Sequence, residues 1–264
     1  MSNQPMISTH QTLPNTFQGR VVLITGASRG IGAATARLFA AHGASVAVNY
    51  HRSEQEAHQI VREIEAGGGR ALAVQASVDD PQQVATMVIR IEAELGAIET
   101  LVMNAAPTKR FVFAPFIDFD WDVFQEMVLG ELSGIYFPAQ AVAPLMIERQ
   151  RGSLIAVSSP LSRMGWQGTL AHAAAKAGVD SMVRTLAVEL GQYGIRVNTV
   201  APGAVPTDSN PMSEEAKQMN INLTPLRRVA RPEDIAGAIY LLALDEAQFI
   251  TGSYTSASGG LQMP

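Results

Sequence analysis

Short runs of apolar residues alternate along the chain with longer stretches in which apolar positions recur every three or four residues. The runs VVLIT near the start and SLIAV in the middle are continuous and apolar. Such runs are typical of strands buried on both faces of a parallel sheet, and the longer stretches have the period of amphipathic helices. The pattern therefore predicts strands and helices in regular alternation.

The predicted strands cover residues 20–25, 45–49, 70–75, 99–103, 153–157, 195–200 and 253–255. The predicted helices cover residues 31–42, 53–66, 80–95, 124–148, 173–191 and 232–244. Repeated strand–helix–strand units build a parallel sheet with helices on both faces. We therefore expect an α/β fold, a single-domain doubly wound parallel sheet of the Rossmann type, and 264 residues suffice for one such domain.

Two segments fall outside this alternation. Residues 1–18 are polar, contain two prolines and lack the apolar stretch of a secretory signal, so we interpret them as a flexible extension preceding a domain at 19–264. Residues 207–231 lack core periodicity, and we expect them to form a lid over the substrate. Its apolar residues facing the substrate would be Met212, Met219, Ile221 and Leu223.

Composition and charge argue against a nucleic-acid-binding protein and against a membrane protein. The formal net charge of −5 and the scattered Lys and Arg residues argue against nucleic acid as a partner. No stretch reaches about 18 apolar residues, so we expect a soluble protein without a membrane span. The chain has no cysteine, which fits a reducing compartment and makes the cytoplasm the expected location, and we predict no metal site.

A glycine-rich loop, TGASRGIG, joins the first predicted strand to the first predicted helix. Glycines there allow positive backbone φ angles and the close approach of a pyrophosphate, while the helix N-terminus offers free N–H groups. Because the motif stands between a strand and a helix at the start of the domain, it predicts a dinucleotide site. Its candidate cofactor-binding residues are Gly26, Ser28, Arg29, Gly30, Ile31 and Gly32.

The end of the second predicted strand indicates which dinucleotide binds. An NAD-specific site usually presents a carboxylate there to the ribose 2′-hydroxyl. This chain has none, and its candidate cofactor-binding residues are Asn49, Tyr50, His51, Arg52 and Ser53. Arg29 and Arg52 can instead pair with a 2′-phosphate, because guanidinium keeps its charge and offers several donors. The sequence favours NADP(H); the alternative is that both arginines are ordinary surface residues.

Further motifs follow the later strands, with Asn104, Ala105 and Ala106 after the fourth and Pro202, Gly203, Val205 and Thr207 after the sixth. With these motifs the chain, from residue 19 to about 260, resembles the short-chain dehydrogenase/reductase family, in particular its 3-oxoacyl-(acyl carrier protein) reductase members. The resemblance implies that both segments bind the cofactor, the second at the nicotinamide carboxamide. It also implies that Ser77 and Val78 lie at the adenine end of the site.

The resemblance implies a catalytic set of Asn, Ser, Tyr and Lys, from which this chain departs. Ser159 and Lys176 match, but His172 stands four residues before Lys176, where the family has its tyrosine. Glu131, in the stretch ELSG, stands where the family has its asparagine. The candidate catalytic residues are therefore Ser159, His172, Lys176 and Glu131, and Lys176 is also implied to hydrogen-bond the nicotinamide ribose.

His172 and Lys176 are one helical turn apart, so the imidazole and the ammonium can lie close together. A nearby cation lowers the pKa of a histidine, whereas Glu131 would raise it, and the sequence does not decide which effect wins. A neutral His172 can donate one hydrogen bond or accept a proton. Since its ring is shorter than a phenol, a substrate or a water must come closer to the helix for proton transfer.

These residues predict an NADPH-dependent oxidoreductase that reduces a carbonyl, or a C=C activated by one, in a small and largely apolar substrate such as an acyl thioester or a natural-product intermediate. Met164, Trp166 and Phe113 are candidates for lining its pocket. Two alternatives stay open. The first is a non-redox dehydratase, isomerase or cyclase with His172 and Glu131 as acid and base, and the second is a cofactor-binding module without enzymatic activity.

The resemblance also bears on assembly. The two long predicted helices, at 124–148 and 173–191, are similar to the pair through which members of the family contact one another. We therefore expect a homotetramer, with a dimer as the next alternative.

Overall fold

The computed structural model describes residues 16–106, 112–207 and 211–263. In these residues seven strands form one sheet in the order β3-β2-β1-β4-β5-β6-β7, with every neighbouring pair parallel. The strands are β1 (Val21–Ile24), β2 (Ser45–Tyr50), β3 (Arg70–Gln75), β4 (Ile98–Met103), β5 (Gly152–Val157), β6 (Ile195–Pro202) and β7 (Tyr254–Ala257). The strand order reverses between β1 and β4, where doubly wound sheets open a crevice at their carboxyl ends. The predicted fold class is confirmed.

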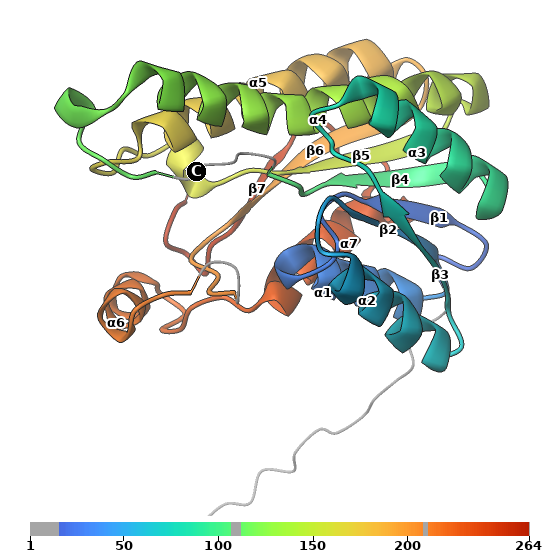
Figure 1. Ribbon diagram of the computed structural model, residues 1–264, viewed down its shortest axis with the longest axis horizontal. Coiled ribbons are helices and arrows are strands. Elements are labelled where there is room, and N and C mark those ends of the chain that lie inside the picture. The colour runs from blue at the N-terminus through green and yellow to red at the C-terminus, as the bar shows by residue number, and fades with distance from the viewer. Residues whose placement is uncertain (1–15, 107–111, 208–210, 264) are drawn as a thin grey trace, which may run out of the picture.

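Helices cover both faces of the sheet (Figure 1). One face carries α3 (Pro81–Glu94), α4 (Trp121–Arg149) and α5 (Leu170–Gly191), and the other carries α1 (Gly30–Ala41), α2 (Glu54–Ala66) and α7 (Pro232–Ala243). A further helix, α6 (Glu214–Leu223), lies apart from both layers. The connections contain the short 3₁₀ helices η1 (Phe116–Asp118), η2 (Pro160–Ser162) and η3 (Asp245–Ala247). In the described part of the chain, no helix has both the length and the apolar character needed to cross a bilayer.

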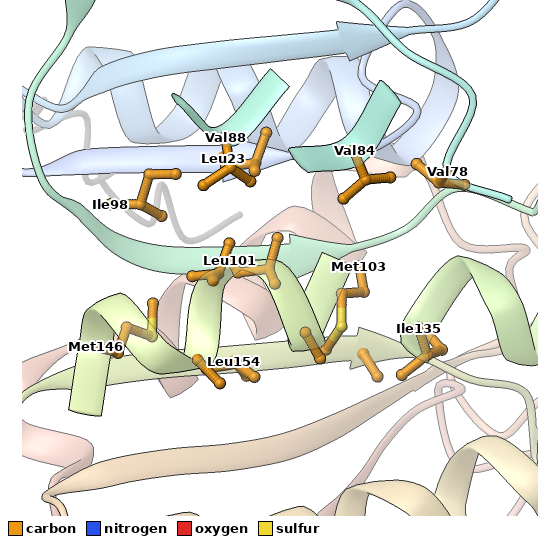
Figure 2. Packing of buried hydrophobic residues seen from close by; sticks show 14 of the residues in the cluster. Leu23, Val78, Val84, Val88, Ile98, Leu101, Met103, Ile135, Met146 and Leu154 are labelled. Atoms are coloured by element: carbon orange, nitrogen blue, oxygen red, sulfur yellow. The ribbon is translucent and has the colours of Figure 1, made fainter. Parts of the chain in front are cut away.

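Apolar side chains alternate between the two faces of the sheet. In β1, Val21 and Leu23 belong to the cluster beneath α3, α4 and α5, while Val22 and Ile24 belong to the cluster above α1, α2 and α7. This period of two is what a strand buried on both sides requires. Figure 2 shows the first cluster, whose labelled members are Leu23, Val78, Val84, Val88, Ile98, Leu101, Met103, Ile135, Met146 and Leu154. Packing on both faces holds the strand ends, and hence the loops that leave them, in fixed places.

The packed part of the domain begins earlier than the sequence indicates. Phe17 is fully buried, and its ring contacts Phe39 and Tyr240 at centroid distances of 4.8 Å and 5.3 Å. Residues 16–18 are therefore part of the packed domain, although the sequence analysis assigned them to the flexible extension. The remainder of that extension, residues 1–15, lies outside the described residues.

Two helix starts that periodicity misses are explained by side-chain caps. α4 begins at Trp121 because the Asp120 carboxylate accepts hydrogen bonds from the backbone N–H groups of Asp122 and Val123. α6, inside the segment 207–231 for which no helix was predicted, begins after Ser213, whose hydroxyl accepts from the N–H of Ala216 at 3.2 Å. None of the α6 residues is buried, so its apolar positions carry no core periodicity.

Candidate active site

A cleft of about 580 Å³ opens at the carboxyl ends of β1, β2 and β4. Most of the predicted cofactor-binding residues line it: Gly26, Ser28, Arg29, Gly30, Ile31, Asn49, Tyr50, His51, Arg52, Ser53, Ser77, Val78, Asn104, Ala105, Ala106 and Thr207. Ala76 and Asp79, which the sequence analysis missed, line it as well. Gly32, Lys176, Pro202, Gly203 and Val205 are not among the lining residues. Residues from five chain segments, at or after the ends of β1, β2, β3, β4 and β6, thus meet in one cleft.

The glycine-rich loop has the conformation of a phosphate cradle. Gly26 and Gly30 have φ angles of 63° and 54°, in the region that favours glycine. A Cβ on Gly32 would stand 2.4 Å from the carbonyl oxygen of Gly26, so a side chain there would force the first turn of α1 away from the loop. The cradle therefore keeps backbone N–H groups at the start of α1 within reach of a pyrophosphate.

Two asparagines, the buried Asn49 and the partly buried Asn104, brace this cradle. The Asn49 side-chain oxygen accepts from the Gly26 N–H at 3.2 Å, while its amide nitrogen donates to the Ala76 carbonyl at 3.1 Å. The Asn104 amide nitrogen donates to the carbonyls of Thr25 and Gly26 at 3.0 Å and 3.1 Å. Their side chains are thus used within the protein, and they preform the loop rather than extending toward a ligand.

Positive charge gathers at the rim beside the end of β2. Arg29 and Arg52 are exposed there, and within the described residues neither guanidinium is paired with a carboxylate. The neighbouring carboxylate of Asp79 accepts a hydrogen bond from the Ser77 hydroxyl. The two arginines are therefore available to an anionic group such as a 2′-phosphate.

Three of the four predicted catalytic residues meet between α4 and α5. Glu131 of α4 is 3% exposed, and its Oε2 lies 2.8 Å from Nζ of Lys176 on α5. Its Oε1 lies 3.8 Å from Nδ1 of His172. Lys176 also donates to the carbonyl of Val157, the last residue of β5, at 2.9 Å. Glu131 therefore does reach this group, which the sequence left open.

The electrostatics of the group leave His172 neutral. Burial lowers the pKa of His172 to about 4, with a further lowering by the Lys176 ammonium that the Glu131 carboxylate opposes. The balance that the sequence could not decide is thus set mainly by desolvation. At neutral pH the imidazole is uncharged, while Glu131 and Lys176 form a buried ion pair.

The fourth predicted catalytic residue, Ser159, follows β5 and caps η2. Its hydroxyl accepts a hydrogen bond from the Leu161 N–H at 3.3 Å. Ser159 and the ammonium of Lys176 therefore both lie at the carboxyl end of β5. Of the residues predicted to line a substrate pocket, Phe113 meets the His172 ring edge-on at a centroid distance of 6.3 Å, and Trp166 is half exposed.

Comparison with known proteins finds relatives over nearly the whole chain. A family model described as enoyl-(acyl carrier protein) reductase matches residues 26–262. L-rhamnose 1-dehydrogenase (NAD(P)(+)) of Sphingomonas sp. (strain SKA58) is 39% identical over 249 residues, which cover 93% of this chain and 97% of that protein. The 3-oxoacyl-(acyl carrier protein) reductase FabG of Staphylococcus epidermidis is 36% identical, over 91% of this chain and 98% of that one.

Solved structures give the same result. A mutant of a Serratia marcescens short-chain dehydrogenase/reductase superposes with a TM-score of 0.86 and 29% identity, over 94% of this chain and 100% of the other. A blue fluorescent protein from a metagenomic library, in complex with NADPH, superposes with a TM-score of 0.83 and 33% identity, over 93% and 99%. The chain belongs to the short-chain dehydrogenase/reductase family.

Proposed function

We propose that this protein is an NADPH-dependent reductase of a carbonyl, or of a C=C activated by one, in a small and largely apolar substrate. The observation that carries the proposal is the buried group of Glu131, Lys176 and His172 beside a preformed nucleotide cleft. The names of the similar proteins, two of them a dehydrogenase and a reductase, support a redox reaction. The NADPH complex of one structural neighbour supports the choice of nucleotide.

The ammonium of Lys176 has a defined task in this proposal. Two of its three N–H donors are directed to Glu131 and to the Val157 carbonyl, at 2.8 Å and 2.9 Å. The third remains for the nicotinamide ribose. When bound, NADPH supplies the hydride. Lys176 orients that cofactor, and Glu131 compensates the lysine charge so that burying it does not destabilise the fold.

The neutral His172 favours reduction of an activated C=C over that of a simple ketone. A ketone becomes an alkoxide and needs a proton at oxygen, which an uncharged imidazole supplies poorly. An enone accepts hydride at its β-carbon and becomes an enolate, which a hydrogen bond from the imidazole N–H stabilises. Water then protonates the α-carbon, so that NADPH and one proton are consumed for each saturated carbonyl product. His172 thus serves as a hydrogen-bond donor at the substrate oxygen.

A substrate panel tests this proposal. Purified protein is incubated with NADPH and, separately, with ketones, enones and enoyl thioesters, and the absorbance of the reduced nicotinamide is followed. We expect turnover of conjugated substrates with one NADPH oxidised per product. Product formation without loss of NADPH would instead support the non-redox alternative, and no reaction with any carbonyl class would support the binding module.

The first prediction concerns the choice of nucleotide. NADPH should bind more tightly than NADH because Arg29 and Arg52 can pair with the 2′-phosphate. Losing such a charge-assisted contact costs about 1.5 to 3 kcal/mol, so Arg52→Ala should remove most of the preference. Dissociation constants from cofactor fluorescence measure this. Arg62→Ala, on the exposed side of α2, is the control, and equal affinities of the wild type for both nucleotides would contradict the prediction.

The second prediction concerns the segment 207–231, proposed to close over the substrate. Met219 and Leu223 of α6 are 47% and 48% exposed, so apolar surface is available there for a bound substrate to cover. Limited proteolysis of the segment should slow when NADPH and a substrate are both present. Residues 208–210 lie outside the described residues. The same cleavage rate with and without both ligands would show that the segment does not close.

The third prediction concerns assembly, proposed to be a homotetramer with a dimer next. Leu129 and Tyr136 of α4 and Val188 of α5 are 62%, 50% and 82% exposed, which leaves apolar side chains on the outer faces of these helices. We expect the paired α4 and α5 helices of two copies to cover them. Light scattering at micromolar concentration should report the tetramer. A stable monomer would contradict the proposal.

A further inference from the structure

A second charged cluster, whose carboxylate is buried, lies next to the active-site group, on the same face of α5. Asp180 follows Lys176 by one helical turn and is 4% exposed. Its Oδ2 lies 3.8 Å from Nε of Arg163, and its Oδ1 has no hydrogen-bond partner among the residues that the structure describes. A buried carboxylate is costly unless a cation compensates it, and Arg163 is the cation that the structure places beside it.

Arg163 comes from the segment that carries Ser159. It directly follows η2, so only the three residues Pro160–Ser162 separate it from Ser159. Its guanidinium carbon lies 3.7 Å from the centroid of the Tyr254 ring on β7, which is a close cation–π contact. Arg163 therefore joins α5 and β7 to the end of η2.

Tyr254 makes a second contact with the segment 159–163, at Ser159. Its hydroxyl donates a long hydrogen bond of 3.4 Å to the backbone carbonyl of Ser159. Burial raises the pKa of Tyr254, so the phenol keeps the proton it donates. The segment 159–163 is thus attached to Tyr254 of β7 at both ends, through the Ser159 carbonyl and the Arg163 guanidinium. Arg163 also links it to Asp180 of α5.

We infer that Arg163, Asp180 and Tyr254 are positioning residues that hold Ser159 at the reacting end of the site. None of the three lines the cofactor cleft, and in this inference they act through the backbone of residues 159–163. This inference rests on the proposed function, because it assigns Ser159 to the reaction. A small displacement of a group aligned with a substrate lowers turnover with little effect on binding elsewhere, so loosening the cluster should act on kcat.

The kinetic test uses two variants and two matched controls. Tyr254→Phe removes only the hydroxyl and keeps the ring for Arg163, and Arg163→Gln removes the guanidinium. Each should lower kcat about tenfold, while the NADPH dissociation constant stays within about twofold. The controls are Tyr193→Phe, just after the end of α5, and Arg184→Gln, on the exposed side of α5. Both should keep the wild-type kcat. A wild-type kcat in a folded Tyr254→Phe protein would overturn the inference, even where Arg163→Gln fails to fold.

A charge test separates positioning from stability. Arg163→Gln leaves the Asp180 carboxylate buried without its cation, so the variant should melt at a lower temperature. Adding Asp180→Asn removes that charge and should restore the melting temperature, but not kcat, since the contact with Tyr254 stays lost. Recovery of kcat together with stability would mean that the cluster only stabilises the fold, and the inference would be wrong.

A spectroscopic readout keeps the inference testable if the proposed reaction fails. Trp121 and Trp166 are the two tryptophans of the chain, and Trp166 follows Arg163 by three residues. In a Trp121→Phe background, Trp166 fluorescence anisotropy reports the order of this segment. We expect lower anisotropy for Arg163→Gln and Asp180→Asn, and no change for Arg184→Gln. Unchanged anisotropy in both Arg163→Gln and Asp180→Asn would overturn the positioning role of the cluster. A wild-type protein that shows no turnover would overturn the proposed function alone.

Discussion

Replacing His172 with phenylalanine is expected to lower kcat about 10²- to 10³-fold, the usual cost of losing a hydrogen bond to a developing oxyanion. NADPH affinity should stay within a few fold, because the ion pair of Glu131 and Lys176 does not depend on the imidazole. Steady-state kinetics with a conjugated substrate and a direct cofactor titration measure the two effects separately. A variant that turns over at the wild-type rate would show that the imidazole does not act on the substrate.

The pH dependence distinguishes a hydrogen-bond donor from a general acid at this position. Because the pKa of His172 is about 4, its protonated fraction falls tenfold for each pH unit above that value. A general acid would therefore lose activity steadily between about pH 5 and pH 8, whereas a neutral donor gives a flat kcat over this range.

His172→Tyr complements this test. It restores the tyrosine that stands in the Ser, Tyr and Lys set of the family. It should raise activity toward simple ketones and damage the native reaction. Since Glu131 still occupies the asparagine position, we expect only a partial gain.

Replacing Glu131 with alanine should have the largest effect on stability. The side chain of Lys176 is 10% exposed and that of Glu131 is 4% exposed, so the variant leaves a buried ammonium without its carboxylate. Breaking a buried pair in this way costs about 3 to 5 kcal/mol. Chemical denaturation measures the free energy of unfolding. Glu148→Ala, at the exposed end of the same helix, should change it by less than about 0.5 kcal/mol.

Two denaturation results test whether the Glu131 carboxylate compensates the charge of Lys176. Glu131→Gln keeps an acceptor for the Lys176 N–H and should lose less stability than Glu131→Ala. If Glu131→Ala unfolds at the same denaturant concentration as the wild type, the ammonium is not buried against this carboxylate, and the compensating role assigned to Glu131 is wrong.

The fold could be predicted because its signals are local. Continuous apolar runs such as those of β1 and β5 and the period of the helices depend only on neighbouring residues. Phe17 was missed because a single aromatic residue in a polar segment has no periodicity, and it is buried by residues remote in sequence, Phe39 and Tyr240. α6 was missed because an exposed helix has no apolar stripe.

In the active site, too, features with a local sequence signal could be predicted and features that depend on distant residues could not. Motifs at strand ends identified the cleft, since parallel strands bring their carboxyl ends to one edge. The protonation state of His172 could not be predicted, because it depends on burial and on the distance between α4 and α5. Arg163, Asp180 and Tyr254 come from three different elements, of which β7 is remote in the sequence, and no spacing rule joins them.

Transfer of deuterium from NADPH carrying two deuterium atoms at nicotinamide C4 tests the central proposal most directly, because one of them is transferred whichever face of the ring is used. The protein is incubated with this cofactor and an enone or enoyl thioester that it turns over, and the product is analysed by mass spectrometry and NMR. We expect one deuterium at the carbon β to the carbonyl, and in His172→Phe we expect turnover to fall and the labelled product to fall with it. Product that carries no deuterium, with both labels retained in the nucleotide, would contradict a reductase.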